Sequence, residues 1–383
     1  MLDKIFTGGK KYWAWMIFLS SIIGAGTLAY LHQYEVGLGV TGMGRDVTWA
    51  FYISQLTFFV GVAASAVMVV LPYYLHDYKK FGKITILGEF LAIGAVIMCM
   101  TFVFVDMGQP LRVVNMFLHP QLTSPMFWDS VSLMGYLVLN IVISRVVLNA
   151  ERNGVKPPKW IKPVIYTSIP WAVSIHTVTA FLYCGLAARP FWMSAIMAPR
   201  FLATAFAAGP ALLIIICFVL RKVSKFDVGK DAIQKLAVIA AYAMFANIFF
   251  LALEFFTAYY SGMHHHTQHF QLLYVGLEGN SSLVPWMWTS TVLAAISLYI
   301  LINPNTRKNE KILGFGAIAV FLSIWMDKGM GLIIAGLVPN PLGYVVDYTP
   351  TLIELTISAG IFALGALIIS ALYKSVLTIR RQV

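Results

Sequence analysis

Long apolar runs, separated by short polar segments, extend along the whole chain. Each run has about 18 or more residues, the length that an α-helix needs to cross the hydrocarbon core of a bilayer. The pattern predicts ten spans at about 12–33, 49–74, 84–106, 127–149, 162–187, 202–221, 233–260, 285–303, 312–334 and 351–374. We therefore predict an all-α polytopic membrane protein that forms a single integral membrane domain.

Composition supports this class. Of 383 residues, 59% are hydrophobic and 11% are charged, whereas a soluble domain is about half apolar and a quarter charged. The basic and then apolar start of the chain resembles a signal peptide. Its apolar run is long and has no clear small-residue cleavage site, so we predict a retained first helix. No stretch remains for a sizeable soluble domain.

Lysine and arginine alternate from one side of the predicted membrane to the other. Basic residues gather at the two ends and after the second, fourth, sixth and eighth spans, and include Lys4, Lys10, Lys79, Lys83, Arg152, Lys159, Arg221, Lys225, Arg307, Lys374, Arg380 and Arg381. The opposite side has only Arg45, Arg112, Arg189, Arg200 and Lys328. The positive-inside rule then places both termini in the cytoplasm and the chain in the cell membrane. The net charge of +11 therefore gives no indication of nucleic-acid binding.

Cysteine and histidine usage argues against intrinsic metal cofactors. Cys99, Cys184 and Cys217 are far apart and lack the spacing of an iron–sulfur motif. A haem in a membrane bundle needs paired histidines on facing helices, and only His176 lies well inside a span. The consecutive histidines at 264–266 do not share a face, so we predict a partner-contacting loop at 264–269 and no metal site.

Ionisable residues inside the predicted spans are the first candidates for function. They are rare in lipid because an unpaired charge is costly there, and the main ones are Glu89, His176, Glu254, Asp327 and Lys328. Each either has a functional role or is a buried group that a neighbouring helix satisfies. Glu89 lies on the cytoplasmic half of the helix that ends at Asp106, so it is a candidate for the start of a proton path.

The loop DMGQPLRVVNMFLHPQLTSPMFWD, residues 106–129, carries more chemistry than a short connector needs. Carboxylates stand at its two ends, Asp106 and Asp129, and Arg112 and Trp128 lie between them. With His176 and Arg189 at the same predicted outer level, these residues are candidates for one site. A quinone needs donors and acceptors at its carbonyls and a proton-exchanging group, for which histidine is suited. The alternative is a solvated connector whose aspartates cap helices.

Several of these segments resemble one family. The runs DMGQPLR and NMFLHPQLTSPMFWD resemble the signature of the NrfD/PsrC family of quinone-interacting membrane subunits. The segments PWAVSIHTVTAFLYCGLAARPFW (170–192) and DKGMGLIIAGLVPNPLGYVVDYTPTLIE (327–354) resemble its ten-helix branch. That branch includes membrane subunits of the Dsr, Hmc and Qrc complexes and of alternative complex III. The resemblance is greatest to DsrP of the Dsr complex. Gln109 departs from the arginine that many relatives have there.

The resemblance implies an architecture. It implies two four-helix bundles, here 49–187 and 202–334, with the first helix and outer loop in 1–48 and the last helix and tail in 335–383. It implies menaquinone bound as a substrate near the outer face, with Asp106, Asp129 and His176 at its site and no other cofactor. Glu254, Asp327 and Lys328 are the implied candidates for a proton route in the second bundle.

The resemblance also implies partners. An outer-side ferredoxin-like iron–sulfur subunit would exchange electrons with the quinone, and a cytochrome b-type membrane subunit and a multihaem cytochrome c would belong to the same complex. We predict a subunit of a respiratory oxidoreductase linked to sulfur or sulfite metabolism, not catalytic alone. Alternatives are an Hmc, Qrc or alternative complex III type subunit, a secondary transporter, or a haem-bearing cytochrome b-like subunit.

Overall fold

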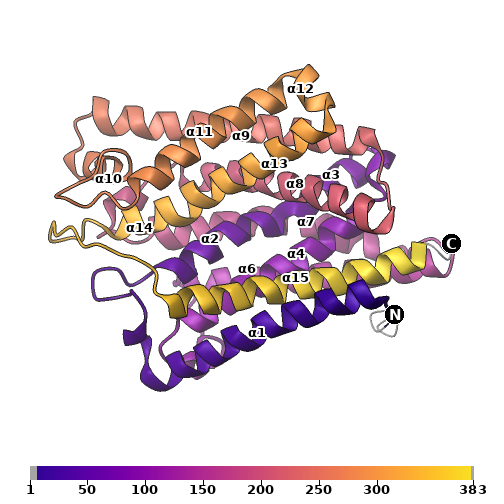
Figure 1. Ribbon diagram of the computed structural model, residues 1–383, viewed down its shortest axis with the longest axis horizontal. Coiled ribbons are helices and arrows are strands. Elements are labelled where there is room, and N and C mark those ends of the chain that lie inside the picture. Colours follow the sequence, from indigo (N-terminus) through magenta and orange to yellow (C-terminus); the bar gives the residue numbers. More distant parts are fainter. Residues whose placement is uncertain (1–6, 381–383) are drawn as a thin grey trace.

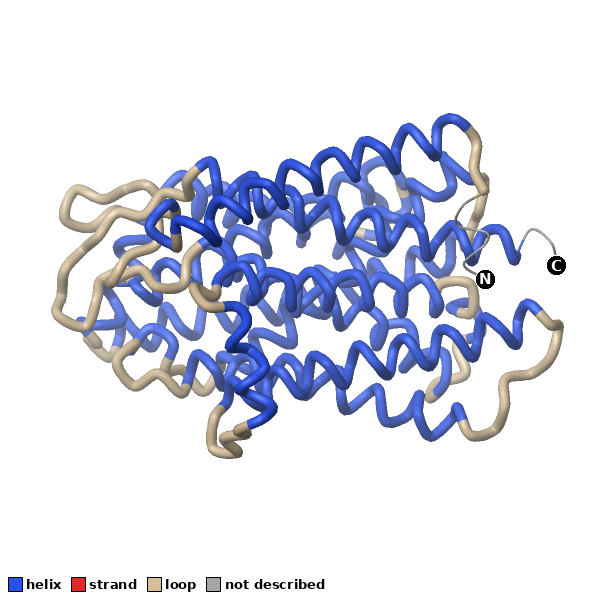
Figure 2. The backbone as a smooth tube through the Cα atoms, turned by 90° about the horizontal axis from the view of Figure 1, so that it is seen from below, coloured by secondary structure: helices blue, strands red, loops and turns tan. Residues whose placement is uncertain are grey.

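The computed structural model describes residues 7–380, and helices without strands make up the fold in this range (Figures 1 and 2). Ten helices of the described part are long and apolar enough to cross a membrane. This confirms the prediction of an all-α, multi-pass membrane protein. Lys4 and Arg381, which we counted among the basic residues of the termini, lie outside the described residues.

The spans are mostly single continuous helices. Most of these begin and end within about three residues of the predicted positions, and the bounds are α1 (Lys10–Val36), α4 (Thr85–Asp106), α6 (Pro125–Arg152), α7 (Ile161–Cys184), α8 (Met197–Ser224), α9 (Lys230–Tyr260), α11 (Val284–Ile302) and α15 (Leu352–Arg380). The second span joins α2 (Phe51–Ala63), the 3₁₀ turn η3 (Ala64–Ala66) and α3 (Val67–Tyr74). The ninth joins α13 (Glu310–Ile324), the π-helix η7 (Trp325–Gly331) and α14 (Leu332–Leu337).

Helix packing follows two rings of four neighbours. In one ring α2 packs on α4, α4 on α6, α6 on α7, and α7 on α2; in the other, α8, α9, α11 and α13 pack in the same way. The rings meet where α8 contacts α2 and α7. Helix α1 packs along α15, and α15 along α4, on one face of the molecule (Figure 1). The division of the chain at residues 48, 187, 202 and 334 stays a prediction.

The two ends of the molecule differ. The start of α1 and the end of α15 lie at one end, which we call the end with the termini, and most of the longer connections lie at the other (Figures 1 and 2). We call the second end the loop-rich end; it carries the segments 37–50, 107–124, 185–196, 261–283 and 338–351. Its short helices are η2 (Leu38–Val40), η5 (Pro110–Val114), α5 (Asn115–Leu118), η6 (Pro190–Trp192) and α10 (His264–Tyr274). The end with the termini carries η4 (Lys79–Phe81) and α12 (Pro304–Lys308). The sequence predicts that the loop-rich end faces outward.

Local signals explain where several helices begin. Proline occupies the first turn of α6 and α11, where the missing amide hydrogen costs nothing. Asn309 caps α13 by accepting from the amide of Lys311 at 3.1 Å. At α15, the Glu354 carboxylate accepts from the Thr351 amide at 2.8 Å, and the Thr351 hydroxyl accepts from the Glu354 amide at 3.3 Å. This reciprocal pair is a capping box, so Glu354 has a structural role.

Burial differs widely among the spans. Every residue of α2 is buried, which accounts for its apolar character on all sides. By contrast α1 buries only Leu19, Gly26 and Gln33. At Gly26 an added Cβ would lie 2.8 Å from the Cα of Gly360, so glycine permits the close approach of α1 and α15.

Two sequence expectations need correction. The segment 264–269 is the start of helix α10, not a loop, and its His269 is buried. Span six begins at Met197 rather than at 202, so Arg200 lies inside a helix and is buried. The first turn of this helix contains polar and proline residues, which is why hydropathy alone starts it too late.

Candidate functional site

A cavity of about 640 Å³ opens between α4 and α6 near the loop-rich end. Its walls are mostly apolar; the residues include Trp49, Ile53 and Leu56 of the α2 region, Ile97, Met100, Val103, Phe104 and Asp106 of α4, Val113, Met116 and Phe117 of the η5–α5 segment, Met126, Asp129, Leu133, Met134 and Leu137 of α6, and Leu182 of α7. Phe104 and Met134 are exposed on the outer surface of the helices. The cavity is therefore open sideways, toward the region where lipid tails would lie.

Asp129 provides the more firmly held carboxylate of this cavity. It lies one turn into α6 and is buried. The hydroxyl of Thr179 on α7 donates to its Oδ1 at 2.6 Å. A buried carboxylate needs such donors because leaving water is costly. The bond fixes one oxygen of Asp129 against α7.

Asp106 provides the second carboxylate. It is the last residue of α4 and lines the same cavity. Its Oδ1 is buried and has no hydrogen-bond partner among the described residues. Buried polar atoms nearly always have a partner, so this oxygen is available to a bound molecule or a water.

His176 is not part of the cavity wall, but it lies on α7 near Thr179, the hydrogen-bond partner of Asp129. It is on α7, three residues before Thr179, which places it about 4.5 Å deeper along the helix axis. Its side chain is 0% exposed. Neither ring nitrogen has a hydrogen-bond partner in the described part of the chain. An imidazole without any partner is an expensive feature of a protein interior.

The other three residues of the predicted site point elsewhere. Trp128 is 47% exposed, and its indole donates to the Leu122 carbonyl at 2.8 Å. Arg112 is exposed on η5, next to Val113, which lines the cavity. Arg189 donates to the Leu337 carbonyl at 2.8 Å, where it satisfies the open end of α14. Both carboxylates thus meet at one cavity, and the two guanidiniums do not.

A buried ion cluster lies in the second ring of helices. The Arg200 guanidinium of α8 contacts Glu254 of α9 at 2.5 Å and both oxygens of Asp327 at 2.8 and 2.9 Å. Arg200 therefore pairs with two carboxylates that the sequence selected separately. A smaller cavity of about 260 Å³ reaches Glu254 from the loop-rich end and is lined by Ser194 and His266.

Lys328 follows Asp327 on the π-helix η7 and differs from it. Its ammonium is buried, has no hydrogen-bond partner among the described residues, and lies 4.1 Å from the centre of the Phe201 ring. An added Cβ at Gly61 of α2 would lie 3.4 Å from this nitrogen. The amine thus lies where the two rings of helices meet. π-Helical segments are rare and are often found at functional sites.

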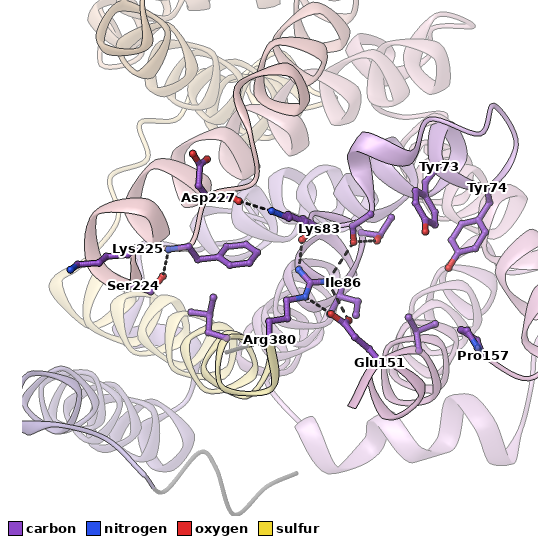
Figure 3. Close-up of a pocket in the computed structure, with 15 residues that line it drawn as sticks. Tyr73, Tyr74, Lys83, Ile86, Glu151, Pro157, Ser224, Lys225, Asp227 and Arg380 are labelled. Atoms are coloured by element: carbon purple, nitrogen blue, oxygen red, sulfur yellow. Dashed lines mark hydrogen bonds and ion pairs between the residues drawn. The ribbon is translucent and has the colours of Figure 1, made fainter. Parts of the chain in front are cut away.

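Glu89 lies toward the end of the molecule that carries the termini. It is buried, and one carboxylate oxygen has no partner in the part of the chain that the structure describes. A cavity of about 660 Å³ opens at this end and is lined by Tyr74, Lys83 and Ile86 (Figure 3). Ile86 is one turn before Glu89 on α4. The cavity therefore brings solvent to within about a helical turn of Glu89.

Sequence reasoning missed Arg200, Thr179, Gln33 and Tyr52. The hydroxyl of Tyr52 donates to Gln33 Oε1, and Gln33 Nε2 donates to the Val105 carbonyl, both at 2.7 Å. Arg200 had a signal, a charge directly before a strongly apolar run. The others have none, because threonine, glutamine and tyrosine occur in many helices without a role.

Metal ligands do not gather in the described residues, where no group of three or more His, Cys, Asp or Glu side chains is placed to hold an ion. The three cysteines are free thiols.

Fold and cavity define a class: a polytopic helical membrane subunit with a lateral apolar cavity and two carboxylates near one end. The comparison with protein families then gives the family. The chain belongs to the polysulphide reductase NrfD family, whose profile matches residues 39–339.

Relatives share nearly the full length of the chain. It is 25% identical to a putative dimethyl sulfoxide reductase membrane subunit of Halobacterium salinarum, over 97% of this chain and 92% of the relative. It is 23% identical to the Hdr-like menaquinol oxidoreductase integral membrane subunit of Archaeoglobus fulgidus, over 95% and 93%. It is 21% identical to a selenate reductase subunit of Mesobacillus selenatarsenatis, over 95% and 94%. These relatives are subunits of oxidoreductases.

Proposed function

We propose that this protein is the quinone-reactive membrane subunit of a respiratory oxidoreductase complex. One observation carries the proposal. A largely apolar cavity of about 640 Å³ opens sideways between α4 and α6 and has the carboxylates of Asp106 and Asp129 in its wall. An apolar ring with two polar carbonyls and a long lipid tail suits such a cavity, since specificity needs only a few polar groups in an apolar lining.

Asp106 and Asp129 have different roles in this account. The Oδ1 atom of Asp106, which has no partner among the described residues, accepts a hydrogen bond from a quinol hydroxyl and takes its proton. Asp129 is held by Thr179 through its Oδ1, and we assign its second oxygen to the quinone.

His176 is the proposed proton acceptor behind Asp129. Its ring nitrogens, unpartnered in the described part of the chain, suit a group that takes up and releases protons, and it lies one turn deeper than Thr179 on α7. We keep Arg112, Arg189 and Trp128 as candidates for the mouth of the site, where the η5–α5 segment and the start of α6 border the cavity.

The proposed substrate is menaquinone, and electrons pass to or from a partner. The relative from Archaeoglobus fulgidus is named a menaquinol oxidoreductase subunit, which supports this quinone. The cavity lies near the loop-rich end, so a ferredoxin-like iron–sulfur subunit docked there would place a cluster near the quinone ring. A cytochrome b-type subunit and a multihaem cytochrome c complete the proposed complex.

A link to sulfur or sulfite metabolism is the finer proposal. This link rests on the sequence resemblance to DsrP of the Dsr complex. The alternatives to a Dsr-type subunit are membrane subunits of the Hmc, Qrc and alternative complex III type. Two of the relatives are named as subunits of a dimethyl sulfoxide reductase and a selenate reductase, so the electron acceptor named differs between them. The identity of the partner subunits decides between these complexes.

Proton transfer is a further part of the proposal. Glu89 lies about one turn from the cavity at the end with the termini, and Glu254 borders a cavity at the loop-rich end. Asp327 joins Glu254 through Arg200, and Lys328 extends this cluster toward the first ring of helices. We propose that Glu89 begins a proton route at the end with the termini. Glu254, Asp327 and Lys328 would form a second route that begins at the loop-rich end.

A secondary transporter is the alternative of another class. Transporter sites lie at helices broken in matching positions of two repeats. Here the broken spans are the first of one ring, at η3, and the last of the other, at η7, so their positions do not match. This argues for the quinone-reactive subunit.

Quinone content and optical spectra of the purified complex test the proposal. The complex is extracted with organic solvent before and after this subunit is washed free of its partners. We expect menaquinone, and no haem absorption, in the isolated subunit. Absence of quinone, together with no protection of the loop-rich end by a quinone-site inhibitor, would support a transporter or scaffold.

A further inference from the structure

Gln33 is a buried polar residue on a helix that is otherwise mostly exposed. The buried residues of α1 are Leu19, Gly26 and Gln33, at intervals of seven. This interval is close to two helical turns, so the three residues form one seam that faces the protein. Burying leucine and glycine in such a seam costs little free energy, because neither has a polar side chain. An amide is costly there unless hydrogen bonds satisfy it.

Both ends of the Gln33 amide are paired across helices. Its Nε2 donates to the carbonyl of Val105 on α4 at 2.7 Å. Its Oε1 accepts from the hydroxyl of Tyr52 on α2 at 2.7 Å. Gln33 and Tyr52 are 2% and 0% exposed. One buried side chain thus joins α1, α2 and α4.

The bond to Val105 fixes the end of α4. The last carbonyls of a helix have no partner within the helix itself and need an outside donor. At Met107 the chain turns to an extended conformation, so a following turn does not provide that donor. Gln33 does, and the next residue is Asp106, whose Oδ1 lacks a partner among the described residues.

Further hydrogen bonds connect the start of α2, next to Tyr52, with the start of α15. The amide of Phe51 donates to the Tyr348 hydroxyl at 3.1 Å, and this hydroxyl donates to Glu354 Oε1 at 2.7 Å. Glu354 belongs to the capping box of α15. The start of α2 is therefore tied to α15 next to the point where Tyr52 meets Gln33.

We propose that Gln33, held by Tyr52, is a positioning residue for the Asp106 carboxylate in the quinone site. This inference rests on the function proposed above. Gln33 and Tyr52 do not line the cavity, so they act only through the end of α4. The flanking helix α1 thereby has a role in quinone binding, although it makes no contact with the bound molecule.

Inhibitor binding to the assembled complex tests this role. The probe is 2-heptyl-4-hydroxyquinoline N-oxide, a fluorescent quinone-site inhibitor whose quenching gives a Kd. We expect Gln33→Leu to raise this Kd, and the KM for a short-chain naphthoquinol, by roughly ten-fold, because small displacements at a site have large effects. Thr27→Val is the control, since the Thr27 hydroxyl bonds only to Ile23 of its own helix and the variant should bind as the wild type.

Two further variants separate positioning from general stability. Gln33→Met keeps the length of the side chain but removes the donor to Val105, so it should weaken binding as Gln33→Leu does. In an Asp106→Asn background, Gln33→Leu should add little, because both changes act on one group. If Gln33→Leu does not assemble, Tyr52→Phe serves instead, with the same expected direction.

Outcomes distinguish this inference from the proposed function. Wild-type binding by Asp106→Asn would contradict the proposed site itself. Weak binding by Asp106→Asn with wild-type binding by both Gln33 variants would overturn the positioning role and leave the site standing. Fully additive effects of Gln33→Leu and Asp106→Asn would also overturn it.

Discussion

Buried polar side chains in this protein fall into two kinds. Asp129, Arg200 and Gln33 have partners on neighbouring helices, and such groups hold helices together. Asp106, His176 and Lys328 have atoms without any partner in the described residues. An unpartnered polar group in a membrane interior costs several kcal/mol. We therefore expect the residues of the second kind to contact a substrate or a water, or to exchange a proton.

Asparagine substitutions at the cavity test the two carboxylates. Asp106→Asn removes the proton acceptor but keeps the size of the side chain, and we expect quinol turnover to fall by about 10²-fold or more. Asp129→Asn should have a similar effect, while Thr179→Val should cost roughly ten-fold because it only loosens Asp129. Asp231→Asn, an exposed ion-pair residue at the opposite end, is the control. If all four variants oxidise quinol at the rate of the wild type, the cavity is not the site of quinol oxidation.

His269 makes the loop-rich end sensitive to acid. Burial lowers the pKa of His269 to about 4, although the carbonyl of Val338, 3.0 Å from its Nδ1, acts in the opposite direction. The folded state therefore favours the neutral ring. Its contribution to stability is complete above pH 6.5 and is lost as the pH falls from 6.5 toward 4, by about 3 kcal/mol in all.

Thermal unfolding between about pH 7.5 and pH 5 checks this expectation. The Tm of the wild type should fall on acidification more than the Tm of His269→Gln, which has no titrating ring. Parallel curves for the two proteins would show that His269 does not cause the acid sensitivity.

Residue types in the loop 106–129 predict Asp106 and Asp129 at one site, and both carboxylates lie in the wall of one cavity. They did not predict that Trp128 and Arg189 turn to backbone carbonyls, because a carbonyl at a helix end is not visible in a sequence. Hydropathy predicts that span six begins at residue 202 and so leaves Arg200 outside it, because the first turn of α8 is polar.

Helices are predicted well here because each span is long and uniformly apolar. Breaks within spans are not predicted, because nothing in the apolar pattern distinguishes η3 or η7 from regular helix. The glycine-rich run Lys328, Gly329, Met330, Gly331 is compatible with a π-helix, but glycines are common in membrane helices. Which face of α1 is buried depends on partner helices, so it too required the structure.

Glycine contacts of α1 give a prediction with a matched control. Gly26→Val places a side chain against the backbone of Gly360, 2.8 Å from its Cα, and neither backbone can move cheaply. We expect the free energy of unfolding to fall by about 1–3 kcal/mol. Gly24→Val meets nothing within 4 Å and should change it by less than about 0.5 kcal/mol.

Size-exclusion profiles after heating in detergent measure this difference. The same Tm for both variants would show that the α1–α15 contact contributes little. Because α1 also carries Gln33, a displaced α1 should in addition weaken inhibitor binding at the cavity.

At the scale of the molecule, the two rings of helices carry different electrostatics. The first has carboxylates at an open cavity, and the second has an ion cluster of Arg200, Glu254 and Asp327. The alternation of basic loops supports the number of spans that the apolar runs predict, because one extra or missing helix would break it. Which residues meet across rings required the coordinates, since packing between distant helices leaves no local pattern.

Breaking the buried ion cluster should be costly. Arg200→Met leaves two buried carboxylates without a counter-charge, and we expect a loss of about 3–5 kcal/mol in the free energy of unfolding. The triple change Arg200→Met, Glu254→Gln, Asp327→Asn removes the unpaired charges and should recover most of it. Thermal denaturation in detergent compares the variants. A triple variant no more stable than Arg200→Met would contradict the electrostatic explanation.

Photolabelling with an azido-naphthoquinone tests the central claim most directly. The label is attached to the assembled complex with and without excess 2-heptyl-4-hydroxyquinoline N-oxide, and modified peptides are sequenced. We predict inhibitor-sensitive labels within residues 97–117 and 126–137, which line the cavity between α4 and α6. Inhibitor-sensitive labels confined to residues 193–196 and 254–266, at the cavity of the second ring, would contradict the account.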